Sequence, residues 1–231
     1  MSAIRAVIFD LFGTLVPEFP HARWDEHFAR MAGALGVDRE RLEEVWRATT
    51  IERQTGRLGD VRAMVVAICR RLGLEPEAER VEAAVTVRLD TYTGIFHAVE
   101  GAEETLRWLR ERGYRIGLIS MCAPETPALW RRLPIASLVD EAVFSSEVGL
   151  RKPDPAIYRL ACERLQVRPV DALYVGDGSY GELTGAEAVG MRAVLIRDPA
   201  EVDGTIHRPE VERWVGASIG SLRDVPALLE D

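Results

Sequence analysis

The sequence lacks several features that mark particular classes of protein. Its three cysteines, Cys69, Cys122 and Cys162, lie far apart without a CxxC pair, so neither a disulfide framework nor a cysteine-based metal site is expected. No apolar run approaches the roughly 20 residues of a membrane-spanning helix, and the N-terminus has no long apolar stretch typical of a signal peptide. We therefore predict a protein of the reducing cytoplasm that does not bind membranes.

Basic clusters and lysine are scarce as well. The net charge is −8 and no block of basic residues occurs, which argues against nucleic acid as a partner. Of the 29 lysine and arginine residues, only Lys152 is a lysine. The 231 residues, 47% of them hydrophobic, suffice for a buried core in one or two domains. Monomer and homodimer are both compatible with these numbers.

Four short apolar runs predict buried strands. They cover residues 4–9, 115–119, 172–175 and 192–196, and each is nearly continuous in apolar character, as strands covered on both faces should be. Helical patterns separate the later runs, and one of them begins with Asp154 followed by Pro155, a typical N-cap and first helical residue. This alternation predicts an α/β fold, with a parallel sheet and right-handed crossovers.

Residues 17–95, between the first two strands, have a different pattern. One helical face is predicted to carry apolar side chains, namely Val61, Met64, Val65, Ile68, Cys69 and Leu72. Little in this region resembles a strand. We expect an all-helical insertion above the carboxyl edge of the sheet, with residues 1–16 and 96–231 forming the core domain.

Polar residues gather where the predicted strands end. In open α/β sheets, ligands bind beyond the carboxyl ends of the strands. The residues expected at or near that edge are Asp10, Gly13, Thr14, Ser120, Lys152, Asp177 and Glu182. Three carboxylates, a hydroxyl and the single lysine at one edge are difficult to explain by solubility alone, so we interpret this set as a functional site.

The residue types indicate the chemistry. Asp10, Asp177 and Glu182 would repel one another in a dry cleft unless a cation lay among them, and Mg²⁺ prefers such oxygen ligands. Asp10 would then be oriented as a nucleophile that forms an acyl phosphate. The amides of Gly13 and Thr14, with Ser120 and Lys152, are the expected partners of the phosphate oxygens, and Lys152 would also compensate the charge of Asp10.

Four segments together resemble a known family. The stretches "DLFGTL", "LIS", "GLRKPDP" and "YVGDGSYGELTGAEAVGM" are similar, in order and spacing, to the four motifs of the haloacid dehalogenase superfamily. The resemblance covers essentially the whole chain, and residues 17–95 resemble the helical cap of that superfamily. It implies a Rossmann-like core, catalysis by Asp10 and, in most members, Mg²⁺.

The sequence departs from the phosphatase pattern at Phe12. Phosphatases of the superfamily carry a second aspartate at this position, which protonates the leaving group and later activates water. Its loss would cost roughly 10²–10⁴ in rate if nothing replaced it. The backbone carbonyl of Phe12 could still bind the metal. We therefore predict a Mg²⁺-dependent phosphatase that acts on a small phosphorylated metabolite through an aspartyl phosphate. Either the substrate has a good leaving group, such as an acyl or aryl phosphate, or a water molecule or cap residue serves as the acid.

Two alternatives stay open, and a third is set aside. A 2-haloacid dehalogenase would have an aromatic residue at position 12 and would use a Trp–Arg pair, here Trp46–Arg47, to hold its substrate. Against it, dehalogenases use no metal and have asparagine where this chain has Met121. A non-catalytic phosphate-binding homologue is the second alternative. A phosphonoacetaldehyde hydrolase needs a Schiff-base lysine in the cap, where this chain has none.

Several smaller signals favour structural roles. Arg47, Arg53 and Arg57 are candidates for binding an anionic substrate group, although each alone is better explained as part of a solvated helix face. Cys122 follows the Ser120 loop, and a buried inert thiol is the expected state.

Overall fold

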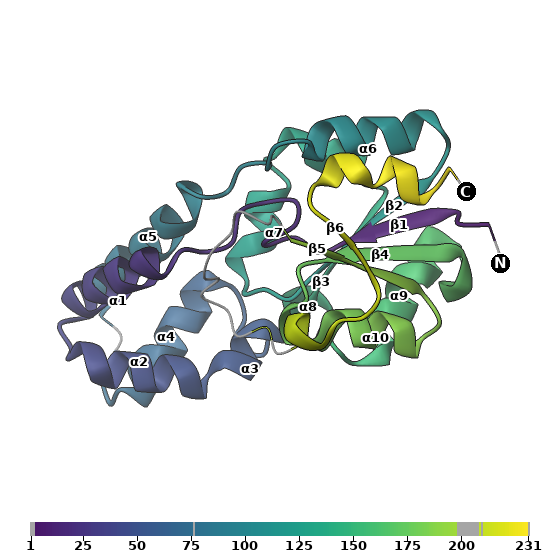
Figure 1. The fold of residues 1–231 in the computed structure, drawn as a ribbon. Helices are drawn as coiled ribbons and strands as arrows, with labels where there is room; N and C mark the ends of the chain where they lie inside the picture. The colour runs from purple at the N-terminus through teal and green to yellow at the C-terminus, as the bar shows by residue number, and fades with distance from the viewer. Residues whose placement is uncertain (1–2, 76, 198–207, 209, 231) are drawn as a thin grey trace.

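The computed structural model describes residues 3–75, 77–197, 208 and 210–230. Six parallel strands form one sheet in the order β3-β2-β1-β4-β5-β6. Their bounds are β1 Ala6–Phe9, β2 Arg115–Ser120, β3 Glu141–Phe144, β4 Ala172–Gly176, β5 Arg192–Ile196 and β6 Ala217–Ile219. The sheet lies at the right of Figure 1, and the helices that follow β1 extend away from it to the left.

The four predicted strands are present, with ends that differ by at most two residues from the apolar runs. The sequence interpretation missed β3 and β6. The first is four residues long and begins with a glutamate, and the second has three residues at the edge of the sheet. A strand that begins with a charged residue, or that has only three residues, shows no continuous apolar run, so only pairing with β2 and β5 defines these two strands.

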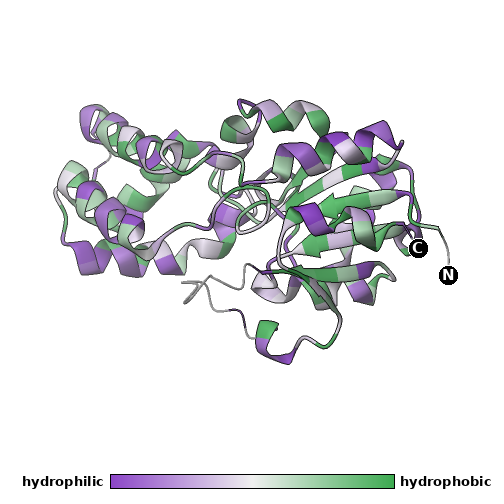
Figure 2. Cartoon of the chain, turned by 45° about the horizontal axis from the view of Figure 1, so that its top comes forward, coloured by the Kyte–Doolittle hydropathy of each residue, from purple (hydrophilic) through white to green (hydrophobic). Residues whose placement is uncertain are grey.

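Helices cover both faces of the sheet. Alternate residues of β1 belong to different cores: Val7 and Phe9 pack in one core with helix α6, and Ala6 and Ile8 pack in the other with α9 and α10. This follows from the period of two in a strand. The bounds are α6 Ala102–Glu111, α7 Glu125–Trp130, α8 Ser145–Val148, α9 Pro155–Leu165 and α10 Glu182–Ala188. In Figure 2 the strands are coloured mainly as hydrophobic, as expected for a sheet buried on both sides.

The region between β1 and α6 is helical, as predicted. It contains α1 His21–Leu35, α2 Arg39–Ala48, α3 Thr50–Gln54, α4 Val61–Arg71 and α5 Ala78–Thr93. Helices α1, α2, α4 and α5 share a core of their own, which includes Met31, Leu42, Met64, Ile68 and Val81. We call residues 17–95 the helical segment below. Among the described residues, no helix is both long and apolar enough to cross a membrane.

Candidate active site at the carboxyl edge of the sheet

The central strands place three of the predicted residues side by side. Strand β1 pairs with β2 and with β4, so that Phe9 is level with Leu118 and with Val175. Asp10 follows β1 directly, Ser120 ends β2, and Asp177 follows β4. Because all three strands run parallel, these residues emerge at the same edge of the sheet, as the sequence predicted.

The loop after Asp10 is tightly folded. Gly13 has a positive φ of 76°, and a Cβ at this position would lie 2.5 Å from Oδ2 of Asp177, so glycine is needed both for its conformation and for the close approach. The Gly13 amide donates to the carbonyl of Val16 and the Thr14 amide donates to that of Leu11. These two predicted phosphate donors are therefore engaged within the loop itself.

The hydroxyls of Thr14 and Ser120 lack partners among the described residues. The Oγ1 of Thr14 and the Oγ of Ser120 are buried and have no hydrogen bond to any described residue. Buried hydroxyls are usually hydrogen-bonded. Two unpartnered hydroxyls near the candidate nucleophile are what is expected if a polar ligand forms hydrogen bonds with them when it binds.

Lys152 lies between two of the carboxylates. Its ammonium donates to Oδ1 of Asp10, and it lies 2.6 Å from Oε2 of Glu182. Burial by itself would lower the pKa of Lys152, but the charges of Asp10 and Glu182 outweigh burial and raise it. Burial raises the pKa of Asp10 to about 6, with Lys152 opposing this rise and Asp177 adding to it.

Glu182 is held by three donors. Besides Lys152, the Tyr174 hydroxyl donates to Oε2 at 2.7 Å and the Gly178 amide donates to Oε1 at 3.0 Å. Burial raises the pKa of Glu182 well above its ordinary value, and the neighbouring Asp10 raises it further. Both carboxylate oxygens of Glu182 are thus already engaged.

Asp177 has a cationic partner that the sequence did not reveal. The guanidinium of Arg208 donates to Oδ2 of Asp177 from Nη2 at 2.6 Å and from Nε at 3.0 Å, and its Nη2 also lies 2.7 Å from Oε2 of Glu18. The Ser179 amide donates to Oδ1 of Asp177. Arg208 lies 31 residues after Asp177, in a stretch with no recognisable motif, so no local signal could have predicted this contact.

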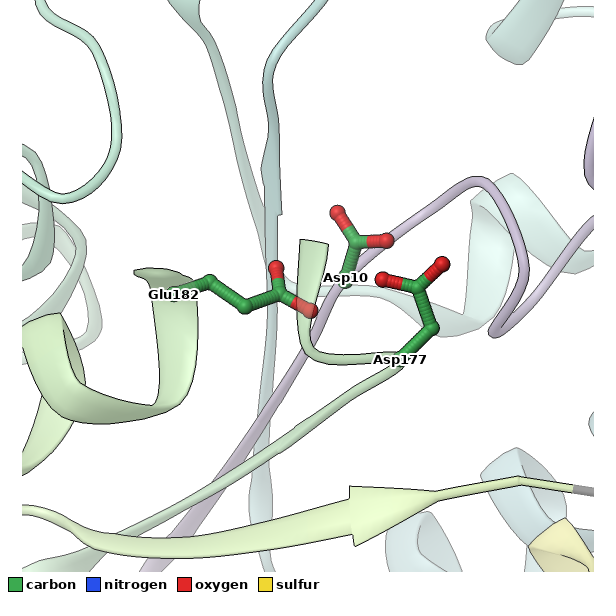
Figure 3. Close-up of side chains that lie close together, drawn as sticks. All are labelled: Asp10, Asp177 and Glu182. Atoms are coloured by element: carbon green, nitrogen blue, oxygen red, sulfur yellow. The ribbon is translucent and has the colours of Figure 1, made fainter. Parts of the chain in front are cut away.

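The three carboxylates fit a divalent cation. Asp10, Asp177 and Glu182 are buried, and one oxygen of each lies within 4.8 Å of the others. Figure 3 shows the three carboxyl groups turned toward one another. With Glu18 included, four carboxylates contact two cations, Lys152 and Arg208, so negative charge is in excess among these contacts when all four are ionised. A hard oxygen donor set with this excess suits Mg²⁺.

A cavity of about 340 Å³ lies between this edge and the helical segment. Asp10, Lys152 and Met121 line it from the sheet side. The helical segment contributes aromatic and cationic side chains, including Trp24, Trp46, Arg47, Arg53, Arg88 and Tyr92. Arg57, also considered from the sequence, does not line the cavity.

Phe12 belongs to an aromatic wall of this cavity. Its ring makes edge contacts with Tyr92 and Phe96, at centroid distances of 6.2 and 5.9 Å. Cys122 also lines the cavity and is buried, and burial raises the pKa of its thiol to about 11, in agreement with the expected inert thiol.

A buried ion pair connects the helical segment with the core domain. Nη2 of Arg88 on α5 donates to Oε1 of Glu125 on α7 at 2.7 Å, and both side chains are almost fully buried. The sequence interpretation missed this pair because its partners lie 37 residues apart and each, taken alone, resembles an ordinary surface residue.

An α/β sheet with a nucleophile candidate after its first strand and a helical insertion over its carboxyl edge defines a class of hydrolases. This chain belongs to the haloacid dehalogenase-like hydrolases, whose family model matches residues 4–190. The resemblance predicted from the four motifs is confirmed.

Two curated relatives are phosphatases by name. The glyceraldehyde 3-phosphate phosphatase of Methanopyrus kandleri is 32% identical over 198 residues, which is 84% of each chain. The ribulose-1,5-bisphosphate 5-phosphatase of Halopiger xanaduensis is 30% identical over 97% of this chain and 98% of its own. Among solved structures, the 2-haloacid dehalogenase of Pseudomonas syringae has a TM-score of 0.72 at 24% identity, covering 98% of both chains, which shows the shared fold.

Proposed function

We propose that this hydrolase is a Mg²⁺-dependent phosphatase that acts on a small phosphorylated metabolite through Asp10. The observation that supports it most directly is the cluster of three buried carboxylates, whose excess negative charge calls for a divalent cation. The names of the two curated relatives support the same reaction class. The helical segment would act as a cap that excludes water and selects the substrate.

Asp10 is suited to nucleophilic attack. Its Oδ1 accepts from Lys152, which holds the carboxylate in place, and Asp10 lines the cavity where a substrate would bind. Oδ2 would form a bond to phosphorus while the bond from phosphorus to the leaving oxygen breaks, and water would then hydrolyse the aspartyl phosphate. Lys152 and the hydroxyls of Thr14 and Ser120 would bind the non-bridging phosphoryl oxygens.

Asp10, the carbonyl of Phe12, Asp177 and Glu182 are the proposed metal ligands. When bound, Mg²⁺ would offset the charges of the carboxylates and of the phosphoryl group. Asp177 would have to share its carboxylate with Arg208, and Glu182 would have to give up part of its present hydrogen bonding. With Phe12 in the usual place of the acid, the favoured substrates carry a leaving group that needs little protonation, such as an acyl or aryl phosphate.

A metal-free 2-haloacid dehalogenase is the second candidate, and two observations favour it. Phe12 and Arg47 both line the cavity, as a halide-releasing site with an arginine for the substrate carboxylate would require. Moreover, Arg208 already compensates Asp177, which lowers the cost of keeping Asp177 beside Asp10 without a metal. Halide departs without a proton, so the missing acid would not matter.

A paired assay distinguishes the candidates. Phosphate release from acetyl phosphate and p-nitrophenyl phosphate is measured with Mg²⁺ and with chelator, beside chloride release from 2-chloropropionate. We expect Mg²⁺-dependent phosphate release that falls by roughly 10³-fold or more in Asp10→Asn, and that is unchanged in the exposed control Asp90→Asn. Chelator-insensitive chloride release would instead establish the dehalogenase. Phosphate binding without either reaction would identify a non-catalytic homologue.

Restoring the acid provides an independent test of the phosphatase mechanism. We expect Phe12→Asp to raise the turnover of alkyl phosphates by roughly 10²-fold or more, and to change acetyl phosphate hydrolysis far less, because only poor leaving groups need the proton. Equal effects on both substrates would contradict the assigned role of position 12.

A further inference from the structure

Building on the proposed phosphatase, we propose that its substrate carries a second oxyanion besides the reacting phosphoryl group, and that Arg53 binds it. The second group is a carboxylate or a further phosphate. Arg53 lies on α3 of the helical segment and lines the same cavity as Asp10 and Lys152. A ligand attached to Asp10 can therefore reach Arg53 across the cavity.

Arg53 is a buried cation without an anionic partner. Only 6% of the residue is exposed, and no carboxylate of the described residues forms an ion pair with it. All its hydrogen bonds go to neutral oxygens: Nε to Oγ1 of Thr49, and Nη2 to the carbonyl of Trp46 and Oγ1 of Thr50. Nη1 has no acceptor among the described residues, although buried charges in proteins are normally paired.

The neighbouring guanidinium shows what a paired site looks like in the same cavity. Arg88 is fully buried and its charge is matched by Glu125 at 2.7 Å. Burial together with the positive charge of Arg88 lowers the pKa of Arg53 to about 10, which indicates that the surroundings disfavour this cation as they stand. A bound oxyanion would supply the missing partner.

The side chain is held in position for such a role. The guanidinium of Arg53 lies over the ring of Trp46, 4.1 Å from its centroid, and the hydrogen bonds of Nη2 fix its rotation. The donors that remain are the two N–H groups of Nη1, and a carboxylate or phosphate oxygen could accept from them. These contacts give the Arg53 guanidinium a defined orientation without a ligand.

Arg53 differs in this respect from the other cavity arginine. Arg47 lines the cavity but is exposed, and water can solvate its charge. The Trp46–Arg47 pair pointed to Arg47 as the anion-binding residue. The burial and the missing partner single out Arg53 instead, six residues further along.

Matched substrates test the proposal. The value of kcat/KM with Mg²⁺ is compared for 4-carboxyphenyl phosphate and phenyl phosphate, which differ in one carboxylate, and for hydroquinone bisphosphate and hydroquinone monophosphate, all of which have the aryl leaving group that the proposed site favours. We expect a preference of about tenfold or more for at least one doubly anionic substrate, since a hydrogen bond to a charged group is worth a factor of that order. The pair that shows the preference identifies the second oxyanion.

Variants locate the source of the preference. Arg53→Gln should reduce the preference to about threefold or less, and Arg53→Lys, which keeps the charge, should restore part of it. Arg57→Gln, which removes the same charge from an exposed position outside the cavity, should leave the preference intact. An equal preference in wild type and Arg53→Gln, or none in wild type, would overturn the proposal.

The anion-binding role of Arg53 can be tested even if the proposed phosphatase reaction is wrong. If no phosphate ester is hydrolysed, the proposed reaction fails, and the dissociation constants of the same two substrate pairs are measured by calorimetry. A tenfold tighter binding of a doubly anionic compound, lost in Arg53→Gln and partly restored in Arg53→Lys, would support the anion site independently of catalysis. Equal dissociation constants across each pair would overturn it.

Discussion

The substitution Lys152→Met tests the charge balance of the site most directly. Lys152 is buried, with a 1% exposed side chain, and contacts both Asp10 and Glu182. Methionine has a similar length and no charge, so the substitution leaves two buried carboxylates without their shared cation. Removing one partner of a buried ion pair typically costs about 3–5 kcal/mol, because the remaining charge is left uncompensated.

The loss should depend on pH. Asp10 has a pKa of about 6 in the folded protein, above its ordinary value of 3.8, so its ionisation already destabilises the native state as the pH rises from about 4 to 6. Lys152 opposes this rise, and its removal would raise the pKa of Asp10 further. The destabilisation by Lys152→Met is therefore expected to grow between pH 5 and pH 8.

Urea unfolding without divalent cations, followed by circular dichroism at both pH values, measures this effect. We expect a loss of about 3–5 kcal/mol at pH 8 and a smaller loss at pH 5. Adding Glu182→Gln to Lys152→Met should recover part of the loss, because the double variant buries one charge fewer. A loss below about 1 kcal/mol at pH 8, or a double variant less stable than the single one, would refute the reasoning.

Two further predictions concern His27 and Arg208. Burial, together with the nearby Arg88, lowers the pKa of His27 to about 2 against about 6.5 when unfolded, so the unfolded chain binds an extra proton below pH 6.5. The titration of His27 alone should therefore lower the free energy of unfolding by about 2 kcal/mol between pH 7 and pH 5. The variant His27→Gln should lack this decrease. If its free energy of unfolding depends on pH as in the wild type, the prediction is wrong. Arg208→Gln should increase the apparent Mg²⁺ affinity several-fold, because it frees Oδ2 of Asp177 and removes a competing cation. Calorimetry measures this affinity. Weaker Mg²⁺ binding would show that Arg208 positions Asp177 for the metal rather than competing with it.

The framework of the site could be predicted from sequence because its signals are local. Each apolar run is a few residues long, and Asp10 and Asp177 directly follow the strands β1 and β4 that these runs form, so the parallel arrangement alone places them at one edge. The N-cap at Asp154 is also local, and the structure confirms it through the hydrogen bond from the Ala156 amide.

The charge pairs of the site could not be predicted in this way. Arg208 contacts Asp177 from 31 residues away, and Arg88 contacts Glu125 from 37. Of the arginines considered from the helical segment, the sequence indicated Arg47, whereas only the packing of α2 and α3 shows that Arg53 is the one buried without an anion.

The sequence by itself therefore determined the α/β order of the chain, its family and the carboxylates at the edge of the sheet. The order of strands and helices and the position of the carboxylates depend on the period of hydrophobic residues and on what immediately follows each strand, and the family depends on the resemblance of four local motifs. Only the tertiary structure decided which charges are compensated. Compensation depends on distance in space and on exclusion of water, and neither quantity is encoded by neighbours along the chain.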